Sequence, residues 1–474
     1  MRDLFFKIQK SNATVKTLWI ISLISIVFIS SMHTYNDILI TSVHGKMLWD
    51  LLFSGKLLDF FQLSNTVSGN IYFPMEQYAA YPFLYYLIFA IIELPIWIIE
   101  KIFQVNAYNT TLSYLYSKLV LIIILLYSTV RYGMVLKQLG KNDEEINIFS
   151  LIYISSMFVF STICITSQYD IINAMLFNIG FYYWLKKDTK LFVLVFSLSI
   201  GLKYFGIMYF IPLLLIEEKK IWKILYKVVL SLIPTFFFML LFYGRTFDQT
   251  GVSGTNIASS YLSKFILIND LQLGNHPIPS FLLIAIISCL FAYFYEYKNE
   301  EEKIQFSIFI LLLLLGAFCL IPNIIPYWSV LALPVLNLSI AMSNGNENKT
   351  VLLETLFGVS ITLYHYFFFN WMFCAKTTSA MGIIPTIFGK WPEPTNNYGV
   401  DSILMSLGLG IDQINLIYIF ALAAWIVWLY FCFPRKEKTV HPITINNLIL
   451  RTVLNIGLAY LPLVSAIYIY LTVY

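Results

Sequence analysis

The sequence predicts an all-α polytopic membrane protein. The chain has 474 residues, of which 59% are hydrophobic, and its mean hydropathy is +0.75. Only 12% of the residues are charged, about half of the ~25% that is typical of a soluble globular domain. The apolar residues also occur in runs of about 20, the length of a membrane-spanning helix. Soluble enzymes and nucleic-acid-binding proteins are therefore excluded, and membrane lipid is the expected surrounding.

Most of the apolar runs are clear candidates for spans, since each approaches the length that a bilayer requires. In chain order they are residues 17–32, 112–135, 146–166, 171–185, 222–243, 279–296, 304–321, 328–342, 351–373, 414–433 and 448–472.

Two further apolar stretches do not fit one straight span. Residues 190–216 are too long for one helix and contain Lys203 in the middle, so we predict two short helices that meet near this lysine. Residues 80–103 are interrupted by Glu93 and Pro95. We predict that they form two interfacial helices with an apolar body and a wet edge.

The distribution of Lys and Arg indicates the orientation, because these residues concentrate in cytoplasmic loops. A cytoplasmic N-terminus places most of the 30 basic residues inside, including those at 131–141, 186–190 and 219–227. The basic N-terminal residues precede an apolar run without a small-residue cleavage site, so we expect a retained first helix. This arrangement gives about 13 crossings of a plasma membrane.

The chain divides into two predicted modules. Residues 1–220 form a transmembrane module whose first outer loop spans 33–110. Residues 221–474 form a second module with outer loops at 244–278 and 374–412. Because the inner loops are short and basic, we expect any functional site to face outward. The five cysteines lie far apart, without a CxxC pair, and no metal site or nucleotide-binding motif is recognised.

The strongest site candidate is Asp37, which follows the first predicted helix in Tyr35-Asn36-Asp37. The residues after it have helical periodicity, with Leu39, Val43, Met47 and Leu51 on one face, and predict an amphipathic helix on the membrane surface. Asp37 would then lie at the boundary between lipid and water. The alternative is that Asp37 only caps this helix.

Asp170 and Lys203 are the next candidates. Asp170 lies in Ser167-Gln168-Tyr169-Asp170, a predicted tight outward turn, where a carboxylate is costly unless it is paired or functional. Its alternative role is to cap the helix that begins at Ile171. Lys203 lies within an apolar stretch and is a functional candidate for the same reason, or else a snorkelling lysine at the interface.

Several weaker candidates complete the predicted site. Arg245 begins an outer loop and is suited to bind a phosphate bidentately, and the same loop contains His276. His44 lies off the apolar stripe of the amphipathic helix. Tyr327 begins a later helix from outside, and a sugar or acceptor groove is the role suited to Glu76 and the tyrosines Tyr78, Tyr81, Tyr85 and Tyr86. Aromatic residues at such positions also form the interfacial belt of membrane proteins.

This pattern resembles the GT-C superfamily of membrane glycosyltransferases. It combines an outward acidic residue after the first helix, amphipathic helices in a long first outer loop, and an acidic residue in the second outer loop. It also has a lysine at the junction of two short helices. The stretch from Gln168 to Pro212 is similar to the bacterial mannosyl- and glucosyltransferase branches, and the resemblance covers residues 15–220.

The resemblance implies a polyprenyl-phosphate sugar donor and a glycan or lipid-linked acceptor of the cell envelope. Asp37 matches the catalytic carboxylate of the first loop, Asp170 the acidic position of the second loop, and Lys203 a basic residue near the lipid phosphate. The family often has paired acidic residues, whereas this chain has Asn36-Asp37 and a single Asp170. A divalent metal is therefore possible but not favoured, and no other cofactor is expected.

The residue types fit this chemistry. A lipid phosphate is a good leaving group, whereas the acceptor hydroxyl needs a base, the role expected of Asp37. Lys203 and Arg245 would stabilise the departing phosphate, and direct displacement would invert the sugar carbon. Asp170 would position the acceptor or orient the surroundings of Asp37. A transporter or flippase of lipid-linked glycans, and a glycan polymerase or ligase, are the alternative functions.

Overall fold

The computed structural model describes most of the chain. The described residues are 12–64, 79, 81–106, 110–243, 270–321, 324–343, 345–374, 377, 399–434 and 443–473. The chain is mostly helical, and its described part contains one small β-hairpin.

The N-terminal half combines long helices with shorter helical segments. Its elements are α2 (Ala13–Met32), α3 (Asn36–Phe53), η1 (Leu57–Asp59), α4 (Phe60–Leu63), α5 (Phe83–Phe103), α6 (Thr111–Gln138), α7 (Asp143–Ile154), the π-helical segment η3 (Val159–Ile165), α8 (Ile171–Leu185), α9 (Thr189–Leu202), η4 (Tyr204–Gly206), α10 (Ile207–Glu217) and α11 (Ile221–Leu241).

The C-terminal half starts with the hairpin, in which Gln272 pairs with Pro277 in antiparallel register. Its elements are β1 (Leu271–Leu273), β2 (His276–Ile278), α13 (Ser280–Phe294), α14 (Glu300–Leu320), η6 (Pro326–Ala332), α15 (Leu333–Ala341), α16 (Glu347–Phe368), η7 (Asn370–Met372), α19 (Val400–Ser406), α20 (Ile411–Cys432) and α21 (Ile445–Val473).

The helices confirm a multi-pass membrane protein. Among the described residues, eight helices are long and apolar enough to cross a membrane, or nine if α7 and η3 form one span broken by 57°. Helices α8, α9 and α13 are apolar but shorter. The two short helices predicted on either side of Lys203 are present as α9 and the pair η4–α10. The number of crossings, about 13 from the sequence, stays a prediction.

The prediction of two interfacial helices within residues 80–103 is wrong in one respect, since residues 83–103 form the single helix α5. This helix is long and apolar enough to span. Glu93 does not interrupt it, because Ser117 of α6 donates a hydrogen bond to Glu93 Oε1 at 2.8 Å. Pro95 removes one backbone donor, and the Tyr116 hydroxyl supplies another to the nearby carbonyl of Ile92 at 2.7 Å. Contacts with α6 thus stabilise a continuous helix, which Glu93 and Pro95 would disfavour in the isolated segment.

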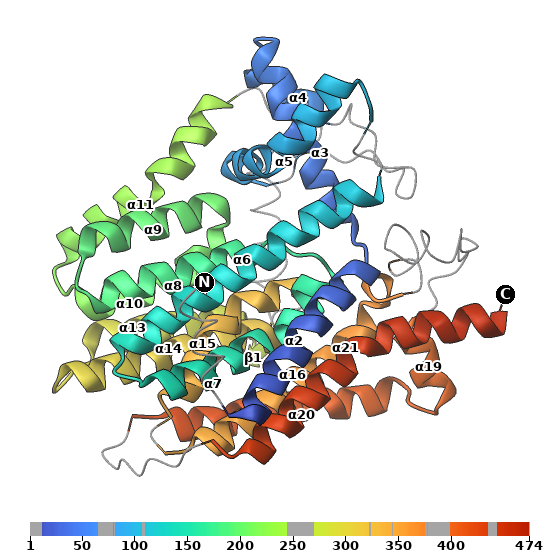
Figure 1. Cartoon of the computed structure of the whole chain (residues 1–474). Coiled ribbons are helices and arrows are strands. Elements are labelled where there is room, and N and C mark those ends of the chain that lie inside the picture. The colour runs from blue at the N-terminus through green and yellow to red at the C-terminus, as the bar shows by residue number, and fades with distance from the viewer. Residues whose placement is uncertain are drawn as a thin grey trace.

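Helix α3 is more buried than an amphipathic surface helix. The predicted stripe residues Leu39, Val43 and Leu51 are buried, but so are Ser42 and His44 on other faces. The reason is that α3 packs against α5, and α3, α4 and α5 gather at the top of the molecule in Figure 1. Gly45 allows this contact, because a Cβ at that position would lie 2.7 Å from the carbonyl carbon of Phe89.

The break between α7 and η3 is stabilised by a residue from α21. Arg451 is fully buried and donates to the carbonyl of Ile152 at 2.9 Å and to Ser155 Oγ at 2.8 Å. It also forms a two-point ion pair with Glu354 of α16, at 2.6 and 2.9 Å. We call Arg451, Glu354, Ser155 and Ser156 the Arg451 cluster; Ser156 Oγ donates to Glu354 Oε1 at 2.9 Å.

Three loops that we predicted to be cytoplasmic lie together at one end of the bundle. Lys187, between α8 and α9, pairs with Glu300 at 2.9 Å. Lys303, in the first turn of α14, pairs with Glu217 at the end of α10 at 2.5 Å. Helix α9 runs from this end to Lys203, so the basic loops and Lys203 are at opposite ends of the same helix.

Candidate functional site

The turn before α8 sets the position of Asp170. Ser167 has a φ of 55°, a left-handed conformation that a non-glycine residue adopts only at a cost. The backbone N–H of Gln168 donates to the carbonyl of Thr162 at 2.9 Å, which closes the π-helical segment. Asp170 then occupies the N-cap position of α8, but its side chain makes no capping hydrogen bond. The side chain of Asp170 therefore does not act as a simple helix cap, which was the alternative role.

The side chain of Asp170 instead binds Lys203. Lys203 Nζ lies 2.8 Å from Asp170 Oδ1 and 2.6 Å from Oδ2. The hydroxyl of Tyr85 donates a third hydrogen bond to Oδ1 at 2.9 Å. Asp170 is fully buried, and Lys203 is 7% exposed. The two side chains of a buried ion pair stay together, because separating them would leave each charge buried without a partner.

Lys203 reaches this position because the chain changes direction there. It is the C-cap of α9 with an extended backbone, φ −152° and ψ 128°, and η4 begins directly after it. Four aromatic rings lie within 6.0 Å of its Nζ atom, an arrangement that favours a cation. They belong to Tyr81 at 5.3 Å, Trp328 at 5.5 Å, Phe205 at 5.9 Å and Tyr327 at 6.0 Å. Lys203 is thus enclosed by aromatic rings and does not snorkel away from its partner.

Asp37 joins the same group from α3. Gln168 Nε2 donates to Asp37 Oδ2 at 3.0 Å, and the hydroxyl of Tyr327 also donates to its carboxylate. Tyr35, not Asp37, is the N-cap of α3, so Asp37 does not serve as a cap. Asp37 lies in the first turn, where the helix dipole favours a negative charge.

The surroundings of Asp37 change the pKa of its carboxyl group. Desolvation raises the pKa of Asp37 above its ordinary value. The hydrogen bond from Gln168, the positive charge of Lys203 and the hydrogen bond from Tyr327 act against this increase. A half-buried carboxylate with a raised pKa is typical of a general base, which has to hold a proton during a reaction.

We call Asp37, Gln168, Asp170 and Lys203 the Asp37–Lys203 cluster. The structure brings together Asp37, Asp170 and Lys203, which were selected from the sequence. Of the weaker candidates, Tyr81 and Tyr327 also lie at this cluster, with their rings beside Lys203.

The remaining candidates lie elsewhere or outside the described residues. His44 is buried in an aromatic group with Phe60 and Tyr86, and its Nε2 is 3.2 Å from the carbonyl of Ser64. His276 is exposed in strand β2 of the hairpin. Arg245, Glu76 and Tyr78 fall outside the described residues.

One member of the site, Gln168, was not assigned a role from the sequence, and Tyr85 was assigned only to the group of tyrosines suited to line a sugar groove. Gln168 connects Asp37 to the Asp170 turn, and Tyr85 binds Asp170. Gln168 does carry a signal, because an amide two residues before an acidic residue, between two apolar runs, is costly unless it is paired. The signal of Tyr85 is weak, since tyrosines are common at membrane interfaces.

The arrangement offers one carboxylate and one cation to a ligand. Lys203 has three N–H donors, and the two oxygens of Asp170 account for two of them. A metal ion would have to displace Gln168 from Asp37 or Lys203 from Asp170. Among the described residues, no group of three or more His, Cys, Asp or Glu side chains is arranged to hold a metal ion.

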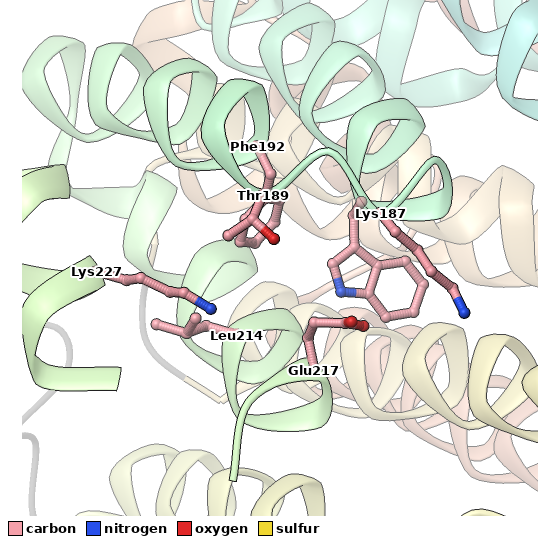
Figure 2. A pocket seen from close by; sticks show the side chains of 7 residues that line it. Lys187, Thr189, Phe192, Leu214, Glu217 and Lys227 are labelled. Carbon is pink, nitrogen blue, oxygen red and sulfur yellow. The ribbon is translucent and has the colours of Figure 1, made fainter. Parts of the chain in front are cut away.

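A hollow in the protein lies away from this cluster, at the other end of α9 (Figure 2). It is lined by Trp184, Lys187, Thr189, Phe192, Leu214, Glu217 and Lys227. Its charged side chains are paired: Lys227 with Glu218 at 3.1 Å, and Glu217 with Lys303. The hollow therefore belongs to the end with the basic loops.

No family model, curated protein or solved structure matches this chain.

Proposed function

We propose that this protein is an integral membrane glycosyltransferase. It transfers a sugar from a polyprenyl-phosphate donor to a hydroxyl group of a cell-envelope glycan or lipid-linked acceptor. The observation that carries the proposal is the convergence of Asp37 with Lys203, from segments 166 residues apart in sequence (203 − 37), on one polar cluster.

Asp37 acts as the general base in this proposal. The acceptor oxygen attacks the anomeric carbon of the sugar while its proton passes to the Asp37 carboxylate. The bond between this carbon and the phosphate oxygen breaks, and its electron pair stays on the polyprenyl phosphate. One displacement of this kind inverts the anomeric carbon. The raised pKa of Asp37 supports the role, because a carboxylate with a higher pKa is a stronger base and accepts the proton more readily.

Lys203 stabilises the negative charge that builds up on the phosphate. Its third N–H donor is available for a phosphate oxygen, and burial strengthens the interaction because water is excluded. Asp170 is a positioning residue, since Lys203 and Tyr85 already occupy its oxygens. The sequence left Asp170 either to position the acceptor or to orient the surroundings of Asp37, and in this proposal it orients Lys203.

The proposed orientation places this cluster on the extracytoplasmic side of the plasma membrane. The basic loops at the opposite end of α9 support it, because such loops concentrate in the cytoplasm. The N-terminus is then cytoplasmic. The isoprenoid chain lies among the exposed apolar side chains of the helices, and α11 exposes many of them, including Phe236, Phe237 and Leu240.

A transfer assay with purified protein tests the proposal. The protein is reconstituted in liposomes with radiolabelled polyprenyl-phosphate mannose or glucose and a membrane extract as the acceptor source. We expect labelled glycan and free polyprenyl phosphate in equal amounts. A fluorescent lipid-linked sugar, followed from one leaflet to the other in the same liposomes, tests transport. Movement of the lipid without release of its phosphate would contradict the proposal and support a flippase.

A further inference from the structure

A row of aromatic rings leads from the Asp37–Lys203 cluster to the protein surface. Tyr327, 6.0 Å from Lys203 Nζ, lies 6.1 Å from the ring of Tyr35, the N-cap of α3. The ring of Tyr35 is in turn 6.1 Å from that of Trp371, with an angle of 37° between them. Trp371 is 46% exposed. The row therefore ends in the indole of Trp371, which packs near the ring of Tyr35 on one side and is exposed at the protein surface on the other.

The residue before this tryptophan belongs to a polar pair. Asn370 Nδ2 donates to Asp401 Oδ2 at 2.8 Å. Asp401 is 9% exposed, and within the described part of the chain its other oxygen, Oδ1, has no hydrogen-bond partner. A buried carboxylate oxygen without a donor is costly, so it is a position at which a ligand hydroxyl gains a strong hydrogen bond.

The backbone fixes these residues relative to Asp37. Cys374 and Gly399 form an isolated antiparallel bridge, which brings Asn370 and Trp371 of η7 close to Asp401 of α19. The N–H of Thr34 donates to the carbonyl of Thr377 at 2.6 Å. Thr34 lies three residues before Asp37, so this hydrogen bond connects the group directly to the start of α3.

We infer that Trp371, Tyr35, Asn370 and Asp401 form a subsite for a sugar ring of the acceptor glycan. A pyranose has an apolar face that packs on an exposed aromatic ring, and hydroxyls that donate to a carboxylate. Trp371 supplies the ring, and Asp401 with Asn370 supplies the polar groups. A tryptophan that only anchors the protein in the interface needs no such polar pair beside it. The identity of the ligand as an acceptor rests on the proposed function.

Sugar binding is tested without any transfer reaction. Purified protein in lipid nanodiscs, free of maltoside detergent, is examined by saturation-transfer NMR with the methyl glycosides of mannose, glucose, galactose and N-acetylglucosamine. We expect saturation transfer to at least one of these sugars, its loss in Trp371→Ala, and partial retention in Trp371→Phe. Trp222→Ala is the matched control, because Trp222 is 80% exposed on α11. The absence of binding to all four sugars, or equal signals from the two alanine variants, would overturn the inference.

Kinetics separate this inference from the proposed function. If the wild type transfers sugar, Trp371→Ala is expected to raise the KM for the acceptor by about 3- to 10-fold, the range for one aromatic contact, with the KM for the donor unchanged. Transfer with unaltered acceptor KM would overturn the subsite and leave the function intact. The absence of transfer by the wild type would overturn the function, and the NMR result would then decide the subsite alone.

Discussion

The Arg451 cluster and the Asp37–Lys203 cluster are both buried ion pairs among apolar helices, but the second includes a further carboxylate. Arg451 is fully buried, and its guanidinium donates to Glu354, Ser155 and the carbonyl of Ile152. Lys203 is 7% exposed and donates to both oxygens of Asp170. A second carboxylate, Asp37, lies half-buried in the same group.

We interpret this difference as one between a structural role and the proposed functional role. The Arg451 cluster joins the break between α7 and η3 to α16 and α21 through four hydrogen bonds from one guanidinium. In the proposed function, Lys203 and Asp37 of the other cluster bind a lipid phosphate and an acceptor hydroxyl. Every buried charge in an apolar chain is costly, so we expect the additional carboxylate to distinguish the two roles better than burial does.

The largest expected effect is on transfer by Asp37→Asn. This change keeps the shape of the side chain but removes the base, so we expect a loss of transfer of about 10²- to 10⁴-fold with an unchanged thermal unfolding temperature. Asp50→Asn is the control on the same helix, because Asp50 is exposed and pairs with Lys101. Equal rates in the two variants would contradict the assignment of Asp37 as base.

Substitutions in the Arg451 cluster should lower the stability of the protein and leave its transfer activity unchanged. Arg451→Met leaves Glu354 buried without its partner and is expected to lower the free energy of unfolding by about 3–5 kcal/mol. The double variant Arg451→Met/Glu354→Leu removes both charges and should regain most of this loss. Unfolding by SDS titration provides the measurement. A double variant that folds normally but loses transfer would contradict the structural role.

The corresponding double variant of the other cluster should give the opposite result. Lys203→Met/Asp170→Asn removes both charges from the pair, so the protein should remain close to wild-type stability. Transfer should nevertheless fall by about 10²- to 10³-fold, because the phosphate loses its stabilising cation. Lys203→Arg, which keeps the charge, should retain more activity than the double variant. If the double variant transfers sugar at the wild-type rate, Lys203 has no role at the phosphate.

The smallest expected effect concerns pH. Asp37 accepts a proton only when it is ionised, so kcat/KM should fall with decreasing pH through a midpoint above the ~3.9 of an ordinary aspartate. Gln168→Leu and Tyr327→Phe each remove a hydrogen bond that lowers this pKa, so both should move the midpoint to higher pH. Asp50→Asn should leave it in place. A midpoint that moves to lower pH in either variant would contradict the described surroundings of Asp37.

The sequence predicts the helical class, most of the helices and three charged residues that the fold brings together, because apolar runs and isolated charges are local signals. The two short helices around Lys203 were predicted from one charge within one long run. The break in residues 143–165 was not, since it depends on Arg451, which is 296 residues from Ser155. The helix at 83–103 was misinterpreted for a similar reason: its stabilising partners, Ser117 and Tyr116, belong to α6.

The contacts within the candidate site could not be predicted from the sequence either. Asp37, Asp170 and Lys203 stand out individually, but the sequence does not reveal that Asp170 pairs with Lys203, or that Gln168 connects Asp37 to the turn. His44 was selected because it lies off the apolar stripe, yet it packs with Phe60 and Tyr86 in the aromatic core. Whether a polar residue is satisfied by the fold depends on its neighbours in space.

The central claim is that Asp37 and Lys203 face one lipid phosphate and its sugar, and a structure with a bound donor tests it most directly. Electron cryo-microscopy of the Asp37→Asn variant with a polyprenyl-phosphate sugar would locate the phosphate. We predict a phosphate oxygen within hydrogen-bond distance of Lys203 Nζ and the anomeric carbon facing residue 37. A phosphate bound elsewhere, with the Lys203–Asp170 pair unchanged, would contradict the account.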